Sequence, residues 1–207
     1  IRRQRQMCIR DSLNLPFTGP NTLLYDPPKE LMKYVAYTEG VATANYALVD
    51  ALTGLDQQVA HLRFPLFVKP AKAGDSLGID EHSIIHNLEE LYRKCNALLP
   101  EYQQLLVEDY IKGREFTVLV AADAANEKHC RVFQPIEYIF PEGRTFKTYA
   151  LKTSELHPEC NIPVQDERIC AELSAAARRI FRSFGGVGYA RICLLYTSPS
   201  PRDRQKS

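Results

Sequence analysis

The chain has 207 residues, with 26 Lys and Arg against 25 Asp and Glu, a formal net charge of +1 at pH 7. No apolar run is long enough to cross a membrane as a helix, and none has the form of a secretory signal. The six cysteines form no C-x-x-C pair and no zinc-type spacing, which favours a reduced setting over a disulfide framework or a zinc site. These bounds leave a globular protein of one domain or two small lobes.

The two ends differ from the rest of the chain. Seven of the 26 basic residues but only two of the 25 acidic ones fall in residues 1–12 and 193–207. A single DNA sequence can encode both ends: one strand encodes QMCIRD (residues 6–11), and the complementary strand encodes CLLYTS (residues 193–198). This resembles a translated sequencing-library adapter rather than a basic arm, so we expect both ends to be disordered and outside the fold. The remainder is mildly acidic, which argues against general nucleic-acid binding.

The elements in the first half follow one another closely. Residues 29–41 have helical apolar spacing and end near Gly40, a residue type that commonly terminates helices. Residues 64–70 form a short apolar run that stops at a proline, as expected of a buried strand, and a loop of small residues follows over 71–79. The apolar spacing predicts a further helix over 82–99.

The second half mixes strands with one clear helix. We predict strands over 104–111 and 114–121 around a turn at Gly113, and an edge strand over 130–140 that Pro135 interrupts. Mixed helices and hairpin-like strand pairs indicate an α+β fold. The strongest helical pattern covers residues 167–185, with a predicted core stripe of Ile169, Leu173, Ala177, Ile180 and Phe184.

Two stretches have the chemistry of a nucleotide site. Lys69 ends a strand and precedes the glycine-containing loop, where backbone N–H groups and an ammonium can meet an anion. Glu108 and Glu115 bracket Tyr110 and Ile111. The two glutamates offer carboxylates for an amino group or a ribose, and Tyr110 and Ile111 offer an apolar surface for a base. Taken separately, an ordinary surface loop and exposed strand-end charges explain the same residues.

The order of six motifs adds to this pattern. They are LPFTGP, LMKYVAYTEGV, FPLFVKPAKAGDSLGI, LLVEDYIKGREFTV, FKTYALKT and GGVGYAR, and together they cover essentially all of residues 13–192. In this order they resemble the D-alanine–D-alanine ligase family of ATP-grasp enzymes. The resemblance implies an α+β ATP-grasp fold of two lobes with mixed or antiparallel sheets. A central lobe would span residues 13–121, and an incomplete second lobe would span residues 122–192.

The resemblance also implies a role for individual residues. Two groups are implied to be catalytic: Lys152 would reach the terminal phosphates, and Arg191 would hold a developing oxyanion. Glu108 would accept from the adenine amino group, and Glu115 would bind the ribose. The residues that the resemblance assigns to ATP binding are Lys33, Lys69, Gly74, Ser76, Gly78, Glu108, Tyr110, Ile111 and Glu115.

Three positions depart from the family pattern. Asp75 and Thr153 stand where the family has a serine and a tyrosine that link the phosphate loop to the substrate side. Cys193 stands where the family has the first Mg²⁺ ligand, so we assign no metal ligand to this chain and expect those ligands beyond it. We therefore expect this stretch to be inactive alone.

The function implied is that of an ATP-dependent carboxylate–amine ligase that acts through an acyl phosphate. Its partners would be small-molecule substrates, an amino acid or another carboxylate with an amine, and no nucleic acid or membrane. The resemblance implies a cytoplasmic location and allows a homodimer. Two alternatives remain open: a non-catalytic ATP-grasp module that only binds a nucleotide, and an ATP-grasp ligase for a different acid and amine.

Overall fold

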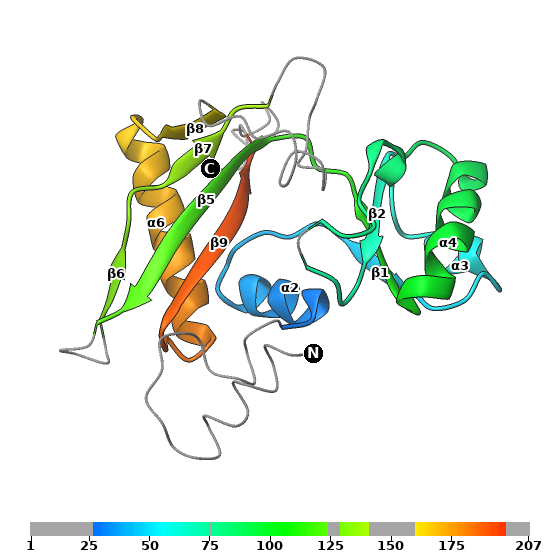
Figure 1. Ribbon diagram of the computed structural model, residues 1–207, viewed down its shortest axis with the longest axis horizontal. Coiled ribbons are helices and arrows are strands. Elements are labelled where there is room, and N and C mark those ends of the chain that lie inside the picture. The colour runs from blue at the N-terminus through cyan, green and yellow to red at the C-terminus, as the bar shows by residue number, and fades with distance from the viewer. Residues whose placement is uncertain (1–26, 75, 124–128, 141–159, 198–207) are drawn as a thin grey trace.

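The chain folds around two antiparallel sheets, seen side by side in Figure 1. The computed structural model describes residues 27–74, 76–123, 129–140 and 160–197. Helix α4 packs on the first sheet and α6 on the second, and α2 lies between them (Figure 1). In chain order the elements are α2 (Lys29–Thr38), β1 (Tyr46–Val49), α3 (Leu55–Gln58), β2 (Leu66–Pro70), η2 (Glu81–Ser83), β3 (Ile84–Ile85), α4 (Leu88–Tyr102), β4 (Leu105–Asp109), β5 (Arg114–Ala122), β6 (Cys130–Val132), β7 (Ile136–Tyr138), β8 (Asn161–Pro163), α6 (Glu167–Ser183) and β9 (Tyr189–Tyr196).

Strand β4 lies inside the first sheet, whose order is β1-β4-β2-β3. Its Glu108 stands opposite Tyr46 of β1 and Phe67 of β2. The neighbouring positions Val68 and Val107 are fully buried in the core that α4 covers. Because successive side chains of a strand point to opposite faces, Glu108, Tyr46 and Phe67 share the face that is turned away from this core. The first sheet therefore carries a charged and aromatic face.

Helix α4 is shorter than the helix predicted over residues 82–99, because it begins at Leu88. Asn87 caps it by accepting a hydrogen bond from the backbone N–H of Glu90 at 2.9 Å. The preceding residues form η2 and the short strand β3, which pairs with β2. The prediction was wrong over this stretch because the isoleucine pair of β3 satisfies helical spacing and a short buried strand equally well.

Strand β5 organises the second sheet. It pairs with β9 along one edge, and with β6 and then β7 along the other, while β8 pairs with β7. Its residues Phe116, Val118 and Val120 are fully buried in the core against α6. The interruption predicted at Pro135 is confirmed, since β6 and β7 are separate strands. Proline has no N–H to donate to the ladder.

The two strands predicted around Gly113 do not form a hairpin. β4 belongs to the first sheet and β5 to the second, so residues 110–113 connect the two sheets. The strand pairing therefore places β5 with the second sheet, whereas the sequence put the lobe boundary after residue 121. A glycine turn between two apolar runs is also typical of a hairpin, and only the distant partner strands distinguish the two arrangements.

The C-terminal part of the chain enters the second sheet further than expected. Strand β9 continues to Tyr196, with Cys193 opposite Thr117 and Tyr196 opposite Arg114. The expectation of disorder was therefore wrong for residues 193–196, whereas residues 1–12 and 198–207 lie outside the described residues. Alternate β9 side chains pack on the core of the second sheet, and an alternating apolar run of any origin fits such an edge.

Asp166 caps the N-terminus of helix α6. The Asp166 carboxylate accepts hydrogen bonds from the backbone N–H groups of Arg168 at 2.9 Å and Ile169 at 3.1 Å. Four members of the predicted core stripe are confirmed, but the buried aromatic residue is Phe181, because Phe184 is the C-cap and lies beyond the helical repeat. The buried residues of α6 are Ile169, Leu173, Ala177, Ile180 and Phe181.

Helices α2 and α6 are joined by hydrogen bonds to one residue. Glu39, the C-cap of α2, accepts from Arg179 Nε through its backbone carbonyl at 3.0 Å and from Ser183 Oγ through its carboxylate at 2.5 Å. Gly40 follows with a φ of 70°, which confirms the predicted helix end. Among the described residues, none of the helices combines the length and apolar character needed to cross a membrane.

The choice of Phe181 over Phe184 as the core aromatic residue can be tested directly. We expect Phe181→Ala to lower the free energy of unfolding by about 3–5 kcal/mol, because it leaves a cavity beneath β5. Phe184→Ala is the matched control and should cost clearly less. Urea denaturation of both variants measures the difference, and an equal loss would contradict the packing of α6.

Candidate functional site

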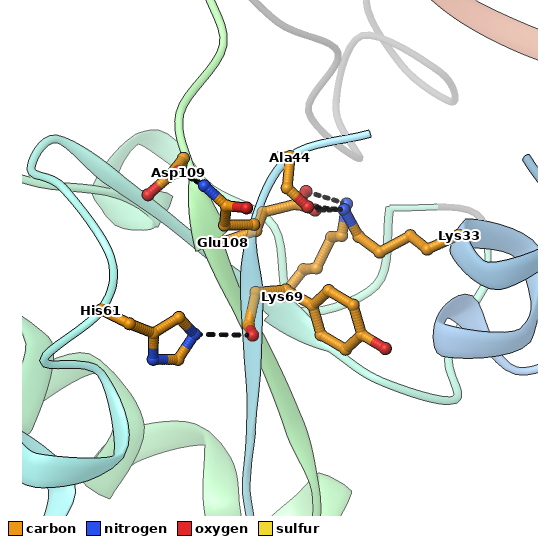
Figure 2. A network of polar contacts seen from close by, with 8 residues as sticks. Lys33, Ala44, His61, Lys69, Glu108 and Asp109 are labelled. Carbon is orange, nitrogen blue, oxygen red and sulfur yellow. Dashed lines mark hydrogen bonds and ion pairs between the residues drawn. The ribbon is translucent and has the colours of Figure 1, made fainter. Parts of the chain in front are cut away.

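Glu108 holds two lysines that come from different elements (Figure 2). Lys33 reaches it from α2, with its Nζ 2.5 Å from Glu108 Oε2, and Lys69 reaches Oε1 from β2. Lys33 also donates to the backbone carbonyl of Ala44 at 3.0 Å. The three side chains are 12%, 21% and 13% exposed for Lys33, Lys69 and Glu108. Three residues that the sequence proposed for one site are thus brought into one cluster.

The charge state of Glu108 follows from two opposing effects. Burial is the largest single influence and raises the pKa of the carboxyl group, because it disfavours the charged form. The positive charges of Lys69 and Lys33 and their hydrogen bonds lower the pKa and together outweigh burial, so the pKa of Glu108 lies below its ordinary value of 4.5. Two ammonium groups facing one carboxylate leave an excess positive charge, which favours an anion such as phosphate.

Aromatic rings line the same face of the first sheet. Lys33 Nζ lies 5.3 Å from the centre of the Tyr46 ring, and Lys69 Nζ lies 5.7 Å from the centre of the Phe67 ring. Phe67 stacks on Tyr110, with ring centres 6.3 Å apart and planes at 21°. Tyr110, which the sequence predicts as part of the surface for a base, therefore lies beside the lysine cluster and stacks on the Phe67 ring. Such a surface suits a planar base.

The connection after β4 is fixed by Asp109, a residue that the sequence analysis did not single out. Its carboxylate accepts from Asn45 Nδ2 at 2.9 Å and from the backbone N–H of Arg63 at 2.8 Å. The next residue, Tyr110, donates its N–H to the carbonyl of Pro65 at 2.9 Å. Figure 2 shows Asp109 beside Glu108. The hydrogen-bond partners of Asp109 lie far away in the sequence. The one local signal for this role is the position of an acidic residue at the end of a strand.

The two ends of the glycine-containing loop that follows Lys69 lie against each other, with Gly78 next to Pro70. Gly78 has a φ of 72°, and a Cβ atom at this position would lie 2.7 Å from Pro70 Cγ, so only glycine allows this approach. Ser76 also has a positive φ, of 61°. Leu77 N–H donates to Gly74 O at 3.1 Å, which closes a turn between two of the predicted loop residues. The loop therefore has its predicted position directly after the strand that carries Lys69, and Asp75 lies outside the described residues.

Two predicted residues lie on the second sheet instead. Glu115 of β5 stands opposite Leu195 and Arg191 of β9 stands opposite Leu119, so both occupy the sheet face that is turned away from α6. Lys152 and Thr153 lie outside the described residues. The structure thus brings together Lys33, Lys69 and Glu108, with Tyr110 beside them, whereas Glu115 and Arg191 belong to strands of the second sheet.

Ile111 lies in the connection between the sheets and is half-buried.

Across the described ranges, no three His, Cys, Asp or Glu side chains gather where they could hold a metal ion. His82 lies in η2 and His86 precedes α4, so the two histidines do not share a helix. The described residues therefore do not by themselves supply a magnesium site.

Comparison with known proteins gives this arrangement a family. The chain matches the profile described as D-ala D-ala ligase C-terminus over residues 35–200. It is 32% identical over 187 residues to the D-alanine–D-alanine ligase of Pseudoalteromonas translucida (strain TAC 125), covering 87% of this chain and 56% of that protein. The chain therefore spans about half the length of the curated relatives that it matches.

Solved structures agree on the fold. The VanG D-Ala:D-Ser ligase from Enterococcus faecalis superposes with a TM-score of 0.76 at 21% identity, covering 93% of this chain and 55% of that chain. The D-alanine–D-alanine ligase from Bacillus anthracis complexed with ATP superposes with a TM-score of 0.70 at 19% identity, covering 92% of this chain and 58% of that chain. The fold is thus the α+β ATP-grasp fold, as predicted. The chain belongs to the D-ala D-ala ligase C-terminus family.

The lysine cluster gives stability a defined dependence on pH. Because the pKa of Glu108 is lowered by folding, its contribution is present above the ordinary pKa of 4.5 and is lost as the pH falls through the folded-state pKa. We expect Glu108→Gln to cost about 1–3 kcal/mol at neutral pH, because it leaves two neighbouring lysines without their carboxylate. The difference from the unmodified chain should shrink below pH 4.5.

Urea denaturation at a series of pH values measures this difference. Glu89→Gln is the matched control, because Glu89 forms an exposed i,i+4 ion pair with Arg93 on α4. We expect the control to cost about 0.5 kcal/mol or less. A Glu108→Gln penalty that did not change with pH would contradict the charged state assigned to Glu108.

Proposed function

We propose that this chain is the ATP-binding core of an ATP-dependent carboxylate–amine ligase that resembles D-alanine–D-alanine ligase. The observation that carries the proposal is the cluster of Lys33, Lys69 and Glu108 beside a glycine-containing loop. The cluster has an excess positive charge, is partly shielded from water and lies next to stacked aromatic rings. These are the requirements of a group that combines a polyphosphate with a planar base.

Each part of the site has a role in this proposal. Lys33 and Lys69 neutralise phosphate charge, and the loop with Gly74, Ser76 and Gly78 folds its backbone N–H groups over the same phosphates. Glu108 accepts from the adenine amino group. Tyr110 and Ile111 contact the base, and Glu115 binds the ribose from the second sheet. The nucleotide would thus bind residues of both sheets.

The chemistry that follows is phosphoryl transfer to a carboxylate. A carboxylate oxygen would attack the terminal phosphorus of ATP, which gives an acyl phosphate and releases ADP. An amine would then attack the carbonyl carbon of the acyl phosphate and expel inorganic phosphate. Such a transfer depends on positioning and charge neutralisation more than on a covalent nucleophile, which agrees with a site built from lysines. Arg191 would stabilise the oxyanion of the tetrahedral intermediate, and Lys152 would contact the terminal phosphates.

The acid and the amine are less closely defined than the nucleotide. The fold is shared with a protein described as a D-Ala:D-Ser ligase, so the fold alone does not select the amine. Asp75 and Thr153, which depart from the family pattern on the substrate side, favour the two alternatives of a different substrate pair or a nucleotide-binding module without ligase activity. We place the intact enzyme in the cytoplasm, where ATP is available, and a homodimer is compatible with this proposal.

The proposal predicts that Lys69 is needed for nucleotide binding. We expect Lys69→Met to weaken ATP binding about tenfold or more, because a charge-assisted contact to phosphate is lost. Isothermal titration of the chain with ATP measures the effect. Arg168→Met is the control, because it removes an equal charge from the exposed side of α6. Equal ATP affinity in the two variants would overturn the phosphate role of Lys69.

A separate assay distinguishes the ligase from the binding module. The intact protein that contains this chain is supplied with ATP and a panel of amino acids, and ADP release is followed. The ligase proposal expects turnover that depends on an amino acid. ATP binding without any such turnover would support the non-catalytic module instead.

A further inference from the structure

Two buried polar side chains meet at a single exposed carboxylate. Among the described residues, Ser83 and Lys94 are the polar side chains classed as buried, and Lys94 is only 7% exposed. Lys94 Nζ donates to Asp80 Oδ1 at 2.7 Å, and the Ser83 hydroxyl accepts from the Asp80 backbone N–H at 3.0 Å. Asp80 also accepts from the backbone N–H of His82 at 2.9 Å, so its carboxylate is fixed from two sides.

A buried lysine is a costly way to fill this position. Removing an ammonium group from water costs several kcal/mol unless a partner compensates it, and an apolar residue of the same volume would avoid the cost. Lys94 lies between Leu91 and Cys95 of α4, both fully buried in the core of the first sheet. Its ammonium group nevertheless reaches out of this core to Asp80. The Lys94–Asp80 pair is therefore better explained by the segment that it keeps in position than by a contribution to the free energy of folding.

What the pair holds is the end of the glycine-containing loop. Asp80 follows Gly78 by two residues, and Gly78 is pressed against Pro70 at the start of the same loop. The first half of the loop is held separately, because Lys29 Nζ of α2 donates to the carbonyl of Ala73 at 2.5 Å. Between these two points lie Gly74 and Ser76, the residues proposed to cover the phosphates. The loop is thus fixed at Ala73 by α2 and at Asp80 by α4.

We propose that Lys94 and Asp80 are a positioning pair that presets the described loop residues, 71–74 and 76–78, for the outer phosphates of the nucleotide. This inference rests on the proposed function of the site. Lys94 does not touch the nucleotide and acts through Asp80. A loop that is already held in place loses less conformational freedom on binding, so more of the contact energy remains as affinity.

The test compares two nucleotides rather than stability alone. Lys94→Met and Asp80→Asn are titrated with ATP and with AMP, which lacks the two outer phosphates. We expect roughly tenfold weaker ATP binding in each variant, the cost of ordering one or two additional side chains on binding. AMP affinity should stay unchanged. Arg93→Met is the matched control, because it breaks the exposed ion pair with Glu89 one residue away on the same helix.

The double variant Lys94→Met with Asp80→Asn guards against simple misfolding. It removes both charges, so no buried ammonium group is left without a partner, whereas Asp80→Asn alone leaves one. We expect the double variant to recover thermal stability but to keep the weak ATP binding. Recovery of ATP affinity together with stability, or equal losses for ATP and AMP, would overturn the inference and make the pair purely structural.

The outcomes also separate this inference from the proposed function. If the unmodified chain binds ATP and the variants bind it equally well, the positioning role is wrong and the nucleotide site stands. If the unmodified chain does not bind ATP, the proposed function fails, and the positioning role fails with it.

Discussion

The ion pairing of Glu108 with Lys33 and Lys69 is the interaction on which the site depends. The two lysines come from a helix and a strand far apart in the sequence, and without the carboxylate their like charges would repel each other in a poorly hydrated place. With it, they are held side by side with one positive charge in excess. The same carboxylate is fixed by its position in β4 between β1 and β2, so the sheet register determines where the positive charge lies.

The sequence predicted the parts of this site better than their arrangement. Local patterns indicated the strand that carries Lys69, the loop after it and the helix with Ile169 and Leu173. What failed was decided by distant partners. β5 joins the second sheet because β9 and β7 pair with it there, and no local feature near Gly113 could reveal that.

The residues that the sequence did not predict share one property. Each forms hydrogen bonds or an ion pair with residues from another part of the chain. Asp109 fixes the connection between the sheets through Asn45 and Arg63, and Lys94 reaches from the core of α4 to Asp80 at the end of the glycine-containing loop. A lysine in a helix and an acid at a strand end usually face water, so composition gave no reason to choose them. Both residues hold elements of the candidate site in place without belonging to the residues that the sequence predicted for it.

The central claim is that the lysine cluster is a phosphate site between the two sheets. A crystal structure of the chain with a non-hydrolysable ATP analogue tests it most directly. We expect the phosphates against Lys33 and Lys69, the base against Tyr110 and the loop of residues 71–78 over the phosphates. An analogue bound elsewhere, with both lysines still paired only to Glu108, would contradict the account.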